Sequence, residues 1–243
     1  MRGGCCTLLA YRLRREPVGV TERGVATMRM HALPTVLIAV GLALPATAAW
    51  SQVPRDLSRN SLVDVLVWGA DVTIDWTPYA RDVRAEAQRY RQRFQSYGAR
   101  RRPPRDPELQ MVHAAHLRYE RTLAAVSDEP RARTSAAEFV ERLKPCYEWE
   151  GYHDCPEHEA RFAAEYQAAN PRGPFRDYLP LLAAHRWLCA AEAYEYEDRP
   201  EDATRSRREF NSALSTARRS AALLVRTAAE ELGARGRCFA SDK

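Results

Sequence analysis

The chain has 243 residues, of which 45% are hydrophobic and 28% charged, and its formal net charge is +5. This length is sufficient for one domain with a substantial core. The positive charge lies at the beginning, because residues 1–50 contain six arginines and two glutamates and leave 31 basic and 30 acidic residues after them. Such a nearly neutral remainder lacks the electrostatic surface that nucleic-acid binding requires, so we expect no nucleic-acid partner.

A hydrophobic stretch near the beginning has the three parts of a secretory signal peptide. Arg29 is followed by an apolar run at 33–44 and by small residues at 46–49, which is the order of basic flank, apolar core and cleavage site. The alternative is a membrane anchor, but a spanning helix needs about 20 predominantly apolar residues. We therefore predict a leader over residues 1–49, with the signal peptide at 28–49.

Two consequences follow from this leader. Met28 and Met30 each offer a start directly before the signal peptide, so we expect that translation begins there and that residues 1–27 are not made. After cleavage, residues 50–243 would form a single domain in the periplasm or the medium, with no integral membrane segment.

The segment from Leu62 to Trp76 gives two patterns. Its first part is almost wholly apolar, which predicts a buried helix, whereas Val72, Ile74 and Trp76 alternate with polar residues as in a strand. No second strand is evident to pair with it. We predict a helix for the first part and leave the second part open.

The rest of the chain carries the three-and-four spacing of apolar residues that is typical of amphipathic helices. Proline, glycine and a Ser135-x-x-Glu138 capping box mark the ends. The predicted helices cover residues 78–97, 107–126, 135–143, 156–169, a start between 174 and 180 to 197, and 201–232. A straight helix over 201–232 would span nearly 50 Å at about 1.5 Å per residue, so we expect a bend or a break in it. The fold class is therefore all-α: an irregular antiparallel bundle or a short α-solenoid.

Four cysteines follow the leader, at positions 146, 155, 189 and 238. An even number in an exported chain favours disulfides, and four cysteines allow three pairings. Cys146 and Cys155 close a short loop and are the preferred pair, which leaves Cys189 with Cys238. That second pair requires the end of the chain to approach the middle of a helix to a Cα–Cα distance of about 7 Å or less.

Small and aromatic residues recur around the last two predicted helices. The pattern consists of Trp187, Ala190, Ala191, Tyr194 and Ala203, with a turn at 198–200. With these residues the C-terminal part resembles a tetratricopeptide repeat, although Phe210 stands seven residues after Ala203 where the family has four. The resemblance covers about 55 residues, and such repeats need about three units for stability. It implies a protein- or peptide-binding scaffold with no chemistry of its own.

The loop between residues 146 and 158 is the best candidate for a functional site. Its Tyr147, Trp149 and Tyr152 could form a recognition surface or could pack over the disulfide as a small satellite core. His153, His158 and Glu150 are the residues that a metal site would use, but their spacing matches no regular zinc motif. We therefore favour a disulfide over a metal in this loop.

The sequence contains no Walker loop, no G-x-S-x-G, no dinucleotide-binding fingerprint and no EF-hand loop. We predict a non-catalytic module with no cofactor that binds another envelope protein or a peptide. The alternative is a metal-binding protein or metal-dependent enzyme that uses His153, His158 and Glu150. His185 lies between apolar residues of a predicted helix, and we expect it to be an interior histidine with satisfied hydrogen bonds.

Overall fold

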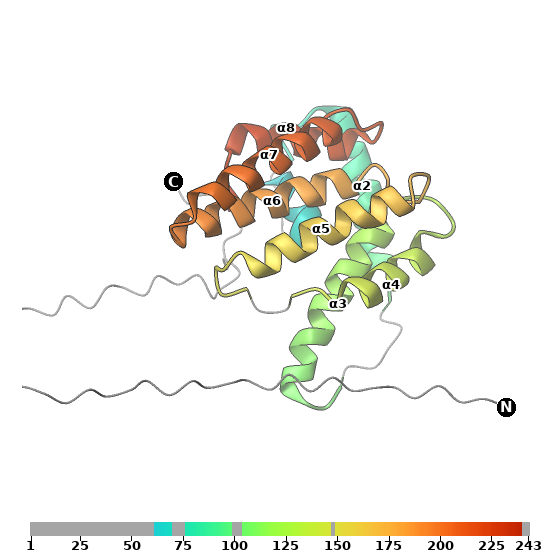
Figure 1. The fold of residues 1–243 in the computed structure, drawn as a ribbon. Coiled ribbons are helices and arrows are strands. Elements are labelled where there is room, and N and C mark those ends of the chain that lie inside the picture. The colour runs from blue at the N-terminus through green and yellow to red at the C-terminus, as the bar shows by residue number, and fades with distance from the viewer. Residues whose placement is uncertain (1–60, 70–75, 99–103, 147–148, 240–243) are drawn as a thin grey trace, which may run out of the picture. The chain divides into compact units, whose positions relative to one another are not determined.

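The computed structural model describes residues 61–69, 76–98, 104–146 and 149–239, all within a compact unit from Thr47 to Lys243. These residues form eight helices and no strand (Figure 1). The helices are α1 (Leu62–Trp68), α2 (Arg81–Ser96), α3 (Pro107–Val126), α4 (Ala132–Leu143), α5 (Asp154–Ala169), α6 (Leu179–Tyr196), α7 (Pro200–Ala217) and α8 (Leu223–Arg235). The all-α prediction is confirmed. The expected leader, and residues 70–75 whose conformation the sequence left open, lie outside the described residues.

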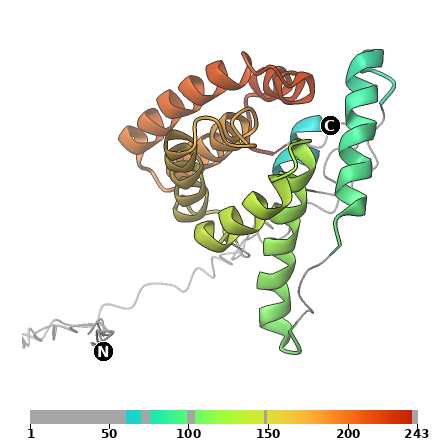
Figure 2. The ribbon, with the colours of Figure 1, turned by 90° about the vertical axis from the view of Figure 1, so that its right-hand side faces the viewer.

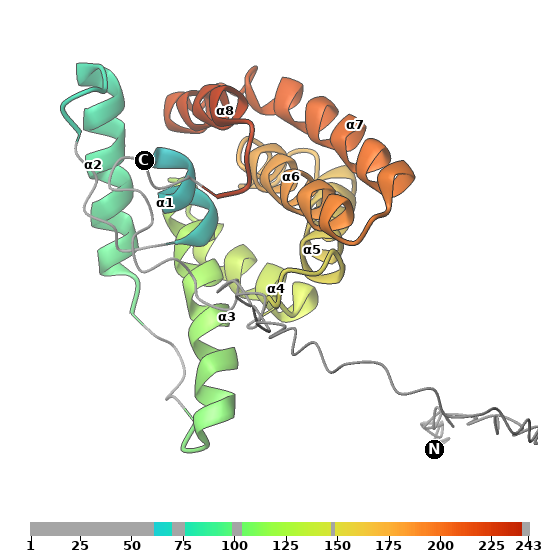
Figure 3. The same ribbon diagram turned by 90° about the vertical axis from the view of Figure 1, so that its left-hand side faces the viewer.

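Helix α6 is the centre of the packing. It lies between α5 and α7, and it also contacts α8 and α1 (Figures 1 and 3). All but three of its 18 residues are buried, so this helix is covered around most of its circumference rather than along one stripe. A helix of that kind is stable only when other helices cover it on every side.

Helix α1 shows the buried helix that its apolar sequence predicts. The Ser61 side chain accepts a hydrogen bond from the Asp64 N–H at 3.3 Å and caps the first turn. Gly69 ends the helix with φ +57°, and a Cβ at this position would collide with the side chains of Thr122 and Arg118 on α3. Glycine is therefore required here both for the left-handed backbone and for the close approach of α1 to α3.

The pair α3 and α4 lies beside this central group, with α2 against α3 (Figure 2). Helix α3 begins at Pro107 as predicted, and the Asp106 side chain accepts the Leu109 N–H at 3.2 Å. The N-terminal part of α3 extends past the other helices in all three views. Leu109 and Met111 on this part are 55% and 49% exposed.

Several predicted helix starts are wrong by a few residues. Helix α4 begins at Ala132 instead of Ser135, because Ala132 and Ala136 are buried in the core and packing stabilises the extra turn. Helix α2 begins at Arg81, three residues after the predicted start, since the Tyr79 N–H is used in a turn to the Trp76 carbonyl. Helix α5 begins at Asp154, which leaves Pro156 in the first turn, where no N–H is needed.

The single helix predicted over 201–232 is broken, as its length suggested. Helix α7 ends at Ala217 and α8 begins at Leu223. The intervening backbone is held by Asp177, whose carboxylate accepts the Ser220 hydroxyl at 3.1 Å and the Ala221 N–H at 3.3 Å. This segment contains no glycine or proline, so the break results from a tertiary hydrogen-bond acceptor and not from a local breaker residue.

Both expected disulfides are present. Cys146 pairs with Cys155 at a Cα–Cα distance of 5.9 Å, and Cys189 pairs with Cys238 at 4.7 Å. The first closes the loop before α5. The second joins the middle of α6 to the segment that follows α8.

Candidate functional site

The sequence allowed two roles for the aromatic residues of the 146–158 loop, a satellite core and an exposed recognition surface, and the structure shows one residue in a position for each. Trp149 is half-buried, and its ring stacks on Trp68 and Phe239 with centroid distances of 6.4 and 5.2 Å. It therefore belongs to a small satellite core. Tyr152 is 53% exposed, so its side chain is presented to solvent. Tyr147 lies outside the described residues.

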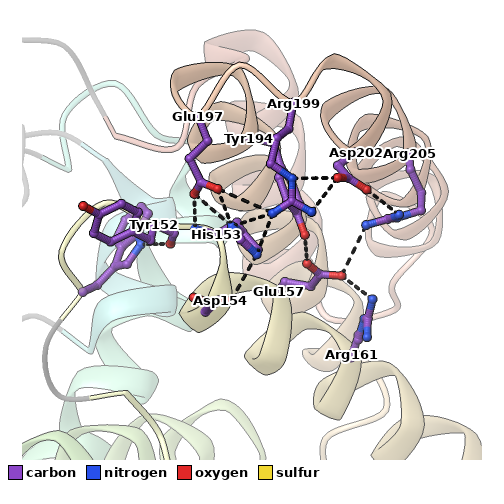
Figure 4. Close-up of polar contacts among 11 residues, drawn as sticks. Tyr152, His153, Asp154, Glu157, Arg161, Tyr194, Glu197, Arg199, Asp202 and Arg205 are labelled. Carbon is purple, nitrogen blue, oxygen red and sulfur yellow. Dashed lines mark hydrogen bonds and ion pairs between the residues drawn. The ribbon is translucent and has the colours of Figure 1, made fainter. Parts of the chain in front are cut away.

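His153 attaches this loop to the end of α6. Its Nδ1 lies 2.7 Å from the Glu197 carboxylate, and its backbone N–H donates to the same carboxylate at 3.0 Å (Figure 4). The imidazole also stacks on the Tyr194 ring at 4.2 Å between centroids. Partial burial raises the pKa of Glu197, but the hydrogen bonds from His153 and the charge of Arg199 outweigh it and hold that pKa below its usual value.

The other end of the loop is attached to the interior. The Cys146 N–H donates to the buried Glu159 carboxylate at 3.2 Å, and Trp149 Nε1 donates to the Tyr152 carbonyl at 2.6 Å within the loop. The loop is therefore held at Cys146, across its middle and at His153, in addition to its disulfide.

An arginine–carboxylate network continues from His153 onto α5 and α7 (Figure 4). Glu157 accepts from the Tyr194 hydroxyl and from Arg161. Asp202 lies 2.6 Å from the guanidinium groups of both Arg199 and Arg205. Burial, followed by the hydrogen bond and charge of Glu157, raises the pKa of Tyr194 to about 12. Each of these guanidinium groups thus has a carboxylate partner within the protein.

Both ring nitrogens of His153 are engaged within this network. Nδ1 faces the Glu197 carboxylate, and Nε2 lies 3.0 Å from Asp154 and 3.2 Å from Arg199.

His158 and Glu150, the other two residues that a metal site in the loop would use, do not share a partner. His158 Nε2 lies 3.1 Å from the Leu143 carbonyl at the end of α4, and Glu150 is exposed. Among the described residues, three potential ligand atoms come within 4.8 Å of one another at His185, Cys189 and Cys238. That cluster is in the interior and not in the loop.

A buried ionic network lies beneath the loop, and sequence reasoning did not identify it. Arg186 on α6 is 2% exposed, and its Nε donates to Glu159 on α5 at 2.6 Å. Its Nη2 donates to the Tyr119 hydroxyl at 2.7 Å and to the Val67 carbonyl at 3.2 Å. The guanidinium also lies 4.1 Å from the centroid of the Trp68 ring. Arg186 stands within residues 179–191, which are otherwise apolar except for His185, but only the packing of α5 on α6 shows that its charge is buried.

The expected interior histidine is confirmed in the same region. His185 is fully buried, with Nε2 2.9 Å from the Cys238 carbonyl and Nδ1 2.9 Å from Arg186 Nη1. Burial, together with the charges of Arg186 and Arg235, lowers the pKa of His185 well below its usual value. The ring is therefore neutral at pH 7.

Compared with protein-family models, with curated proteins and with solved structures, the chain matches none of them.

Proposed function

We propose that this protein is an exported helical scaffold that binds a protein or peptide of the cell envelope. The binding surface would be the loop–turn surface, which we define as residues 149–153 and the α6–α7 turn at 196–199. The observation that carries this proposal is the attachment of the loop at both of its ends, at Glu159 and at Glu197. A loop held in this way presents Tyr152 without a large cost of ordering upon binding.

The composition of the loop–turn surface supports recognition. Tyr152 and Tyr196 are 53% and 78% exposed, and the Arg199 side chain is 42% exposed. Tyrosine and arginine are enriched among the residues that dominate protein–protein binding energy. The tetratricopeptide-like pattern of α6 and α7 is consistent with the same role, because such helical hairpins serve as peptide-binding scaffolds.

The disulfides support the proposed export. Both cysteine pairs of the described residues are in disulfides, which persist in oxidising compartments such as the periplasm and the extracellular medium. The signal-peptide pattern at 28–49 supplies the route.

Site-specific photo-crosslinking in the organism that encodes the protein tests the binding surface. A photoreactive phenylalanine analogue replaces Tyr152 in the full-length chain, and the matched control carries the analogue at Met111, which is 49% exposed on α3. We expect a discrete cross-linked species from position 152 that is absent from position 111. Equal cross-linking at both positions, or none at 152, would contradict the proposal.

The mass of the purified mature chain tests export independently. A mass that corresponds to cleavage near Ala48 and to the loss of four hydrogens in two disulfides is expected. An uncleaved chain in which every cysteine is a free thiol would exclude export, whatever the cross-linking shows.

A further inference from the structure

The Cys189–Cys238 disulfide has a buried histidine directly beside it. His185 and Cys189 are one helical turn apart on α6, so their side chains share a face. Cys238 approaches that face from the segment after α8, and all three residues are at most 1% exposed. The Cys189 sulfur lies 3.5 Å from His185 Nδ1 and 3.9 Å from Nε2.

The hydrogen bonds of His185 determine which ring nitrogen holds its proton. Nε2 faces the Cys238 carbonyl, which can only accept, so Nε2 carries the hydrogen. Nδ1 faces Arg186 Nη1, which can only donate, so Nδ1 presents a lone pair. A metal-binding histidine characteristically donates its second N–H to a backbone carbonyl or a carboxylate. His185 is already held in that state.

The distances fit a tetrahedral metal ion. With Zn–S near 2.3 Å and Zn–N near 2.0 Å, a tetrahedral angle places a ligand sulfur about 3.5 Å from a ligand nitrogen. The separation of Cys189 Sγ from His185 Nδ1 is 3.5 Å. When the disulfide is reduced, its two sulfurs must separate, and both become potential ligands on the same side of the ring.

The charges around the cluster also favour a divalent ion with two thiolates. Arg186 is paired with Glu159 at 2.6 Å, and Arg235 is paired with Asp64 at 3.0 Å. One neutral histidine, two thiolates and Zn²⁺ have no net charge, so their burial adds no unpaired charge to the interior. Arg186 would lose its bond to Nδ1 but would keep those to Glu159 and Tyr119.

We propose that His185, Cys189 and Cys238 form a zinc site when the Cys189–Cys238 disulfide is reduced. The disulfide takes up two electrons and two protons from an external dithiol, which itself becomes a disulfide, and Zn²⁺ then displaces the two thiol protons into solvent. A water completes the coordination, and the Glu192 carboxylate, which accepts the Cys238 N–H at 2.9 Å, helps to position Cys238.

Zinc binding to the reduced full chain tests this site. The Cys146→Ala/Cys155→Ala variant retains the proposed ligands, and Cys189→Ala/Cys238→Ala is its matched counterpart without them. Each is reduced anaerobically with a phosphine, which does not compete for zinc as a dithiol does, and is titrated with zinc sulfate against a chromophoric chelator. The first variant should bind one zinc per chain. The second should bind at least about 100-fold more weakly, since loss of supporting residues alone costs up to that factor.

Cobalt and a second pair of variants identify the ligands. Co²⁺ bound to the Cys146→Ala/Cys155→Ala variant should give a thiolate-to-cobalt charge-transfer band. Addition of His185→Gln to that variant should weaken metal binding. Addition of His153→Gln/His158→Gln should not. Zinc held equally well by Cys189→Ala/Cys238→Ala would place the metal in the 146–158 loop and overturn the proposal. If reduction unfolds the chain, zinc should restore its helical circular dichroism, and a failure to do so would also overturn it.

Discussion

Two ionic networks in this protein are built from the same residue types but differ in their access to water. In the interior, Arg186, Glu159 and Tyr119 are bonded to one another, and the Arg186 and Glu159 side chains are 2% and 5% exposed. At the loop–turn surface, His153, Glu197 and Arg199 are joined in a similar way, but their side chains are 17%, 15% and 42% exposed. The first network has no alternative partner in solvent, whereas the second does.

This difference determines what each network contributes. Removal of one partner from a buried pair leaves an uncompensated charge and is strongly destabilising, while exposed pairs contribute little to stability. We infer that the interior network fixes how α5, α6, α3 and α1 pack, because its bonds reach residues on all four helices. The surface network instead fixes one loop, with little effect on the rest of the fold.

The largest expected effect is that of Glu159→Gln. The charge of Arg186 would then be buried without a counterion, so we expect the free energy of unfolding to fall by about 3–5 kcal/mol. Urea denaturation followed by circular dichroism measures it. The double variant Arg186→Met/Glu159→Leu should recover part of the loss, because no charge remains to be paired. A fall of less than about 1 kcal/mol in the single variant would show that the pair is not buried in solution.

Loss of the interior Cys189–Cys238 disulfide should destabilise the protein more than loss of the Cys146–Cys155 disulfide at the surface loop. Cys189 and Cys238 are 49 residues apart and Cys146 and Cys155 are 9 apart, so the longer loop restricts the unfolded chain more. The loop-entropy relation gives a loss of about 4 kcal/mol for Cys189→Ala/Cys238→Ala and about 2.5 kcal/mol for Cys146→Ala/Cys155→Ala. Thermal unfolding of the two variants under oxidising conditions compares them. The reverse order would mean that the surface loop, not the interior, limits stability.

The buried His185 should make stability depend on pH. Its pKa is lowered in the folded protein by burial and by Arg186, so the unfolded chain binds more protons below its ordinary pKa of about 6.5. The free energy of unfolding should therefore fall as the pH drops below about 6.5, by at most about 1.4 kcal/mol per pH unit from this group. His185→Gln, which can still donate to the Cys238 carbonyl, should lack that component. If the free energy of unfolding depended on pH equally in the unaltered protein and in His185→Gln, the pH dependence would not arise from His185.

The smallest effect on stability is expected for Glu197→Gln at the surface network. We expect a loss of about 1 kcal/mol or less. Amide hydrogen exchange should nevertheless become faster at His153, whose N–H donates to Glu197, while amides in α6 remain protected. Uniformly faster exchange would show that the two networks are not separate in their effects.

The sequence was most informative where spacing alone determines structure. The apolar period predicted the helices around Val83 and Leu123, and the nine-residue separation of Cys146 and Cys155 favoured their pairing. It was least informative where a distant residue decides the outcome. Asp177 holds the break between α7 and α8, and nothing near position 220 indicates it.

The candidate site shows the same limit. The loop and His153 could be selected from residue types, but the Glu197 partner lies 44 positions away and belongs to a different helix. Arg186 and Glu159 have the side chains of ordinary surface residues, and only the packing of α5 on α6 shows that they are buried. A pattern along the chain records which residues are charged, but it does not record which of them meet.

The packing of α1 also bears on the order in which the chain can fold. Its Leu62 N–H donates to Glu231 on α8, and its Asp64 is paired with Arg235 at the end of that helix. During synthesis α1 therefore emerges long before α8, and it cannot reach its final packing until α8 has also been made. The N-terminal helix of the described fold thus depends on a segment about 170 residues further along the chain, which makes its burial a late step of folding.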